Sequence, residues 1–150
     1  AIATIDGTNV SGSSYSAYLF KGIDGFSRFG SYIGNGSANG PFVYTGFKPR
    51  YVMIKNADLA GDWYVWDTAR DVFNPVSATL FTNTNGAETS AESIDMLANG
   101  FKARSATVAN VSNAKYIYAA FAEVPLKYSA GSSSFFLRDV ISYLMGVSFK

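Results

Sequence analysis

The sequence contains no cysteine and no histidine, and these two absences exclude many functions. Without cysteine the chain forms no disulfide and offers no thiolate zinc site, iron–sulfur ligand or cysteine nucleophile. Without histidine it has neither the base of a Ser-His-Asp triad nor an imidazole metal ligand. An enzyme built from this chain would have to work with carboxylates, lysine, tyrosine or serine. We therefore expect no metal site, no cofactor, no catalytic residue and a protein that is not an enzyme.

An excess of one charge and long apolar runs are also missing. The formal net charge is only +1, and the two signs are interspersed, so no basic stripe for nucleic acid is predicted. No apolar run approaches the roughly 18 residues of a membrane span. The first residues, Ala1 to Gly7, lack the charged and then apolar order of a signal peptide. Nucleic acid and a membrane span are therefore not among the expected partners.

What the chain does contain is a large share of aromatic residues separated by turn-forming residues. Hydrophobic residues make up 48% and aromatic residues 16% of the 150 positions, and glycine occurs 14 times. Tyrosine and phenylalanine favour the pleated surface of a strand, and glycine with Asn, Ser and Thr between apolar runs favours tight turns. The length suits one domain with a substantial core. The predicted fold is all-β, a single antiparallel β-sandwich of the lectin or jelly-roll kind.

Several short apolar runs are expected to be the strands. The strongest is Lys115–Val124, in which apolar residues alternate between the two faces, and Arg50–Lys55 suits a buried strand. The pair Asn99-Gly100 predicts a type I′ hairpin turn, and Gly34, Gly36, Gly40 and Gly46 are interpreted as turn residues. The further candidates are Phe42–Thr45, Trp63–Trp66, Ala78–Thr82, Asp95–Ala98, Phe101–Arg104 and Thr107–Val111.

Both ends of the chain differ from this pattern. Residues 1–29 are expected to form an extended N-terminal arm, residues 30–128 the sandwich, and residues 129–150 a Ser-rich linker and an apolar tail. Leu137, Val140, Ile141, Leu144 and Met145 match the spacing of one face of a helix. Such a tail either packs on its own domain or docks on a neighbouring subunit. Its candidate assembly residues are Phe135, Phe136, Val140, Ile141, Leu144 and Met145.

One strand carries a candidate ligand site. In Trp63–Asp67, alternation places Trp63 and Val65 on one face and Tyr64 and Trp66 on the other, and one of these sets belongs to the core. Aromatic faces stack on sugar rings, and a nearby carboxylate can hold sugar hydroxyls. The candidate ligand-binding residues are Tyr64, Trp66 and Asp67.

The remaining acidic residues have mainly structural interpretations. Asp62, Asp67 and Asp71 lack the spacing of an EF-hand, so we expect them to cap turns or to pair with Arg70 or Lys55. Arg50 and Lys102 are expected to pair with Asp67 or Asp95 inside the sandwich. A carboxylate pair for glycoside cleavage would have to come from Glu88, Glu92 and Asp95. These three lie in or beside a polar stretch, where a solvated surface is expected.

An ordered set of phrases between Gly30 and Tyr128 resembles a module of tailed-bacteriophage virion proteins. The phrases are Gly34-Asn35-Gly36-Ser37, Gly40 to Pro49, Val52 to Lys55, Gly61-Asp62-Trp63, Asp67-Thr68, Arg70, Asn74-Pro75, Ala87-Glu88, Ile94-Asp95, Asn99 to Lys102 and Tyr116 to Glu123. The resemblance covers about two-thirds of the chain. It implies a lectin-like β-sandwich at the C-terminal end of tail-fibre-type proteins that face host surfaces, without a catalytic motif. The tail after Tyr128 departs from the family pattern.

The resemblance and the residues together predict a structural virion protein that acts by assembly and adhesion. The expected partners are other copies of the chain (a trimer if it is a fibre), other virion proteins and a host cell-surface glycan. The expected location is the virion, after assembly in the host cytoplasm. Two alternatives stay open: a capsid-decorating or head-fibre protein, and, in a different class, a glycan depolymerase that uses carboxylates.

Overall fold

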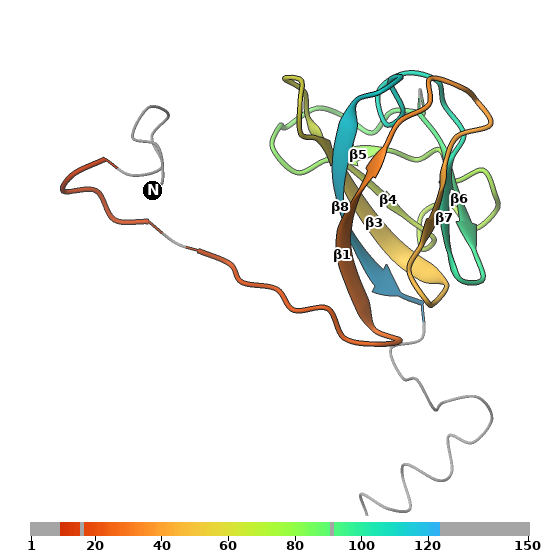
Figure 1. Cartoon of the computed structure of the whole chain (residues 1–150), viewed down its shortest axis with the longest axis horizontal. Coiled ribbons are helices and arrows are strands. Elements are labelled where there is room, and N and C mark those ends of the chain that lie inside the picture. Colours follow the sequence, from red (N-terminus) through yellow and green to blue (C-terminus); the bar gives the residue numbers. More distant parts are fainter. Residues whose placement is uncertain (1–9, 16, 91, 124–150) are drawn as a thin grey trace, which may run out of the picture.

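The computed structural model describes residues 10–15, 17–90 and 92–123, and in this part of the chain every regular element is a β-strand (Figure 1). The all-β prediction is confirmed. The strands are β1 (Ser27–Ile33), β2 (Phe42–Tyr44), β3 (Pro49–Asn56), β4 (Trp63–Asp67), β5 (Leu80–Phe81), β6 (Ile94–Leu97), β7 (Gly100–Ala103) and β8 (Lys115–Ala122).

The strands form two antiparallel sheets that face each other. The larger has the order β1-β8-β3-β4-β5 and the smaller the order β2-β7-β6. The two longest strands, β3 and β8, lie at the centre of the large sheet, as the sequence predicted for Arg50–Lys55 and Lys115–Val124. The predicted antiparallel β-sandwich is therefore confirmed.

The core lies between the sheets and is built by one alternating set of side chains from each strand. Val52, Ile54, Trp66 and Tyr116 from the large sheet meet Phe101 from the small sheet, and all five are fully buried. Burying side chains of this size stabilises the fold by about 1.5–3 kcal/mol each relative to leaving them exposed. Because successive side chains of a strand point to opposite faces, the other set of side chains from the large sheet lies on its outer face.

The β6–β7 hairpin forms where Asn99-Gly100 predicted one, but its turn differs from the prediction. Leu97 pairs with Gly100, so Ala98 and Asn99 make the turn, and Gly100 is not among the residues with positive φ. The glycine is required for a different reason. A Cβ atom at Gly100 would lie 2.2 Å from the carbonyl oxygen of Val43, because β2 crosses closely there.

The segment Thr107–Val111, predicted as a strand, is an irregular loop organised by the fully buried side chain of Asn110. The Oδ1 atom of Asn110 accepts the backbone N–H of Asn35 at 2.8 Å. Its Nδ2 atom donates to Oδ1 of Asn35 and to the carbonyl oxygens of Ser37 and Ser105, at 2.8, 2.7 and 3.1 Å. The turn around Gly36, whose φ is positive, is thereby tied to the loop. A side-chain amide here replaces a strand ladder, which the short apolar pattern did not reveal.

The boundaries of other elements also move. β5 is shorter than the predicted Ala78–Thr82, and β1 begins at Ser27, before the Gly30 boundary expected for the sandwich. The described residues of the arm, up to Phe26, form no strand and leave the sandwich in an extended path (Figure 1). The predicted tail, with Phe135, Phe136, Val140, Ile141, Leu144 and Met145, lies outside the described residues. Within the described part of the chain, no helix is long and apolar enough to cross a membrane.

Candidate binding surfaces

The outer face of the large sheet is apolar along its central strands. Antiparallel pairing places Tyr51 opposite Phe121 and Met53 opposite Ala119 between β3 and β8, and Phe29 opposite Ala119 between β1 and β8. A sheet with one solvated face normally alternates apolar inward and polar outward residues. Here both sets are apolar, which is the composition of a sheet that is covered on both sides.

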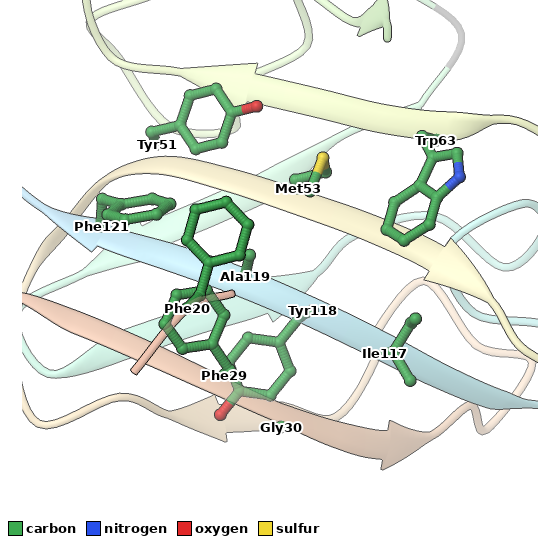
Figure 2. A pocket seen from close by; sticks show the side chains of 10 residues that line it. All are labelled: Phe20, Phe29, Gly30, Tyr51, Met53, Trp63, Ile117, Tyr118, Ala119 and Phe121. Atoms are coloured by element: carbon green, nitrogen blue, oxygen red, sulfur yellow. The ribbon is translucent and has the colours of Figure 1, made fainter. Parts of the chain in front are cut away.

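Aromatic rings contact one another across this face (Figure 2). Phe20, from the arm, stacks on Phe29 with ring centroids 5.5 Å apart. Phe29 and Tyr51 both meet Phe121 edge to face, at 5.8 and 5.9 Å. Phe26 meets Phe121 from the chain reversal before β1, at 6.1 Å. These edge-to-face and stacked pairs hold the rings in a fixed array, because aromatic quadrupoles favour such geometries.

The array borders a groove of about 590 Å³, which we call the aromatic groove. It extends from Phe20 and Phe121 at one end to Trp63 and Ile117 at the other, with Met53 between them (Figure 2). Its full lining is Phe20, Phe29, Gly30, Tyr51, Met53, Trp63, Ile117, Tyr118, Ala119 and Phe121, a set without a charged residue. Such a surface suits apolar or aromatic groups.

The predicted ligand residues Tyr64, Trp66 and Asp67 do not form one site, because Asp67 lies on the face opposite the other two. Tyr64 and Trp66 share the inner face, as the alternation predicted, and their rings stack at 6.0 Å. Trp66 is fully buried, and its indole N–H donates to the carbonyl oxygen of Glu92 at 3.4 Å. Its ring therefore cannot stack on an external sugar, and its assignment to a ligand platform does not fit the structure. Tyr64 is half-buried against Phe81, and burial raises its pKa, with Asp62 adding to the effect.

Asp67 points to the opposite side, in register with Tyr51, and is engaged in a local network. Its Oδ1 atom accepts the backbone N–H groups of Ala69 and Arg70 at 3.0 Å, and its Oδ2 atom pairs with Nε of Arg70 at 2.6 Å. Arg70 also forms an ion pair with Glu88. Partial burial opposes ionisation, but the hydrogen bonds and charge of Arg70 together hold the pKa of Asp67 below its usual value. The expected turn-capping and pairing with Arg70 are confirmed.

The other acidic residues fill mostly structural positions. Asp62 accepts a hydrogen bond from Asn83, and Asp71 accepts backbone N–H groups of Ser77 and Ala78, which lowers the pKa of Asp71. The predicted pairing of Asp67 or Asp95 with Arg50 or Lys102 is wrong. Asp67 pairs with Arg70, and Asp95 pairs with Arg104 at 3.3 Å, because these arginines extend from the ends of the strands.

Glu92 was expected on a solvated surface, and this prediction is wrong because its side chain is buried. Its Oε1 atom accepts the hydroxyl of Thr107 at 2.6 Å, and its Oε2 atom has no hydrogen-bond partner among the described residues. Residues 92–94 lead into β6 beneath Trp66, which explains the burial. In the described ranges no group of acidic residues is arranged to hold a metal ion.

The sequence interpretation missed the aromatic groove, although its signal was present. The alternation that placed Trp63 opposite Trp66 implied that one tryptophan faces outward, and Ile117 and Phe121 occupy the same face of β8. Tyr64 and Trp66 were predicted as ligand residues because the carboxylate of Asp67 follows them in the sequence. Which of two apolar faces meets the second sheet is decided by tertiary packing, which alternation alone does not encode.

Comparison with known families gives one match. A search of curated proteins and a search of solved structures each found no significant match. A family model described as a domain of unknown function, DUF7483, matches residues 1–125, a range that includes both the arm and the sandwich. The chain therefore belongs to the DUF7483 family.

Proposed function

We propose that this chain is a non-enzymatic structural protein of a tailed-bacteriophage virion, which acts through assembly and adhesion. The observation that carries the proposal is the described part of the arm, residues 10–15 and 17–26. There Tyr18 and Leu19 are 84% and 95% exposed, and Phe20 beside them is also largely exposed. Single exposed apolar residues are ordinary, but adjacent large ones on a projecting segment mark an interaction site.

The path of the arm supports a partner outside the same domain. Figure 1 shows residues 10–15 and 17–26 leading away from both sheets, and the ring contacts with the sandwich come from Phe20 and Phe26, in the last part of this segment. Phe20 is held at the sheet edge by its stack on Phe29, which directs the preceding residues outward. In an assembly, a neighbouring copy or another virion protein would cover Tyr18 and Leu19.

The virion assignment is supported by where the phrases resembling the phage module lie. Val52 to Lys55 lies in β3, Tyr116 to Ala122 lies in β8, and Asn99 to Lys102 covers the turn and start of β7. The loop Gly34 to Ser37 is held by Asn110. The phrases are thus the parts that build the sandwich, so a shared phrase set supports a shared module.

The depolymerase alternative receives no support from the described acids. The aromatic groove has no carboxylate in its lining. Glu88 is paired with Arg70, Asp95 is paired with Arg104, and Glu92 lies inside the sandwich. Glycoside cleavage needs two carboxyl groups about 5–10 Å apart across an accessible sugar site. We therefore place adhesion ahead of cleavage.

The assembly part is tested by sedimentation of the full chain. We expect an oligomer, and we expect the double variant Tyr18→Ser with Leu19→Ser to weaken self-association by about tenfold or more, since each serine removes apolar area from the interface. The matched control is Tyr44→Ser, which changes an exposed aromatic residue on the small sheet. A wild-type chain that stays monomeric at its highest soluble concentration contradicts self-assembly. The symmetry of the oligomer separates a fibre, expected to be trimeric, from a capsid-decorating protein.

The adhesion part is tested with a glycan array and with bacterial polysaccharide. Full-length protein should bind a subset of surface glycans without producing new reducing ends. Release of reducing ends would instead establish the depolymerase. Asp67→Asn and Tyr64→Ala are the variants that test the predicted ligand residues which remain at least partly accessible.

A further inference from the structure

The aromatic groove is an apolar surface that the described residues leave largely uncovered. It lies on the outer face of β1, β8, β3 and β4, while the small sheet covers the inner face. Phe20 closes one corner, but Trp63 and Met53 are only partly buried and Ile117 is 38% exposed. Apolar residues on both faces of β3 and β8 indicate a cover on each side. The second cover is absent from residues 10–15, 17–90 and 92–123.

The chain continues from the strand that forms the floor of this groove. β8 contributes Ile117, Ala119 and Phe121 to the groove and ends at Ala122. Residues 124–150 follow, and by sequence they include the strongly apolar segment 135–149. In that segment Leu137, Val140, Ile141, Leu144 and Met145 have the spacing of one face of a helix.

We propose that residues 135–149 dock in the aromatic groove of their own chain and form the second cover of the large sheet. In this arrangement the apolar side chains of Val140, Ile141 and Leu144 would pack against Met53, Trp63 and Ile117. The tail is then a structural layer of the domain, while assembly uses the arm. The inference concerns folding of the single chain, and it stands or falls independently of the virion assignment.

Dimensions allow this docking. A strand of eight residues, as β8 is, extends about 27 Å. Residues 135–149 would extend about 22 Å as a helix, which matches the length of the sheet face. The stretch 124–134 reaches at most about 40 Å, so the apolar segment can start at either end of the groove.

Proximity favours the segment of the same chain over that of a second copy. A segment tethered by a short flexible linker is present at an effective concentration of about a millimolar. A neighbouring copy in dilute solution competes at far lower concentration. The linker is rich in serine, with Gly131 and Ser132 to Ser134. A linker of this composition lets the following segment turn back onto the sheet.

The absence of cysteine provides a direct test by disulfide trapping in the full chain. Ile117→Cys is combined in turn with Ile141→Cys, Leu144→Cys and Met145→Cys, and the pairs are oxidised under non-reducing conditions. At least one pair should close within the monomer, at a rate about tenfold above the control pairs, because docking raises the local concentration of the two thiols. The controls are Ile117→Cys with Ser142→Cys, on the other side of the predicted helix, and Tyr44→Cys with Leu144→Cys, on the other sheet.

Trp63 provides a second, independent readout. Trp66 is buried in the core, so an aqueous quencher such as acrylamide reports mainly on Trp63. In the full chain with Ile141→Asp and Leu144→Asp, the quenching constant should roughly double, since the indole in the groove becomes accessible. Ser142→Asp should leave the quenching constant unchanged.

Three results would overturn the proposal. Equal trapping rates for the groove pairs and the control pairs would show that the tail has no preferred site. Trapping that yields only covalent dimers would assign the groove to a second copy. Quenching that is identical in the wild type and in the Ile141→Asp, Leu144→Asp variant would show that the tail leaves Trp63 exposed. None of these results depends on glycan binding or on sedimentation of the arm variants.

Discussion

Trp63 and Trp66 occupy the same strand, three positions apart, yet they lie on opposite faces of the large sheet and have different surroundings. Trp66 is fully buried between the sheets and contacts the ring of Tyr64 and the backbone of Glu92. Trp63 is only partly buried and borders the aromatic groove. The inner face is thus completed by the described residues, whereas the outer face has the same apolar character without the same cover. Residue type alone therefore does not distinguish core from surface in this chain.

The largest effect is expected from Trp66→Ala. Removing a fully buried tryptophan leaves a cavity and should lower the free energy of unfolding by about 3–5 kcal/mol. Urea denaturation of the full chain measures it, with Trp66→Phe as a milder variant if the alanine variant does not fold. A loss below about 1 kcal/mol would mean that the inner face is not the main core.

A smaller but substantial effect is expected from Asn110→Ala. The change leaves the backbone N–H of Asn35 and the carbonyl oxygen of Ser37 without their partner, and the cost should be about 2 kcal/mol. The measurement is thermal unfolding monitored by circular dichroism. Asn85→Ala, which removes an exposed amide on a distant loop, is the matched control. Equal transitions for the two variants would contradict the role given to Asn110.

Trp63→Ala sharpens the comparison of the two faces. If the tail covers the groove, its cost in the full chain should be about 1–2 kcal/mol, less than that of Trp66→Ala because the site is only partly buried. In the background of Ile141→Asp with Leu144→Asp, the same substitution should cost clearly less. This double-mutant cycle measures the coupling between groove and tail. Additive costs would indicate that Trp63 and the tail do not interact.

The smallest effect is expected from Asp67→Asn, which keeps an acceptor for the backbone N–H groups but removes the charge facing Arg70. The pKa of Asp67 is lowered in the folded chain, so its charge stabilises the fold above the ordinary value of 3.8, and this contribution is lost as the pH falls further. The variant should therefore lose about 0.5 kcal/mol near neutral pH and nothing in strong acid. Unfolding curves across that range test this. A loss that persists in acid would point to geometry instead of charge.

Much of the fold could be predicted from the sequence, because its strongest signals are local. The runs in β3 and β8 were identified by their apolar patterns, and the β6–β7 hairpin by Asn99-Gly100. The loop Thr107–Val111 was not identified, since a buried amide distant in sequence determines its conformation. The candidate site was the weakest part, because Tyr64 and Trp66 belong to the face that the small sheet covers. That choice between faces depends on contacts between residues far apart along the chain.

The hydrogen bonds between Asn35 and Asn110 have a consequence for how this family changes over time. The side-chain amide of Asn110 accepts a hydrogen bond from the backbone N–H of Asn35 and donates one to the side chain of Asn35, across a separation of 75 residues. Replacing Asn110 leaves the backbone N–H of Asn35 without its partner, whereas replacing Asn35 leaves Asn110 bonded to the carbonyl oxygens of Ser37 and Ser105. Relatives should therefore keep Asn110 more strictly than Asn35. Retention of Asn110 alone would carry a record of the loop geometry even where the rest of the sequence has diverged.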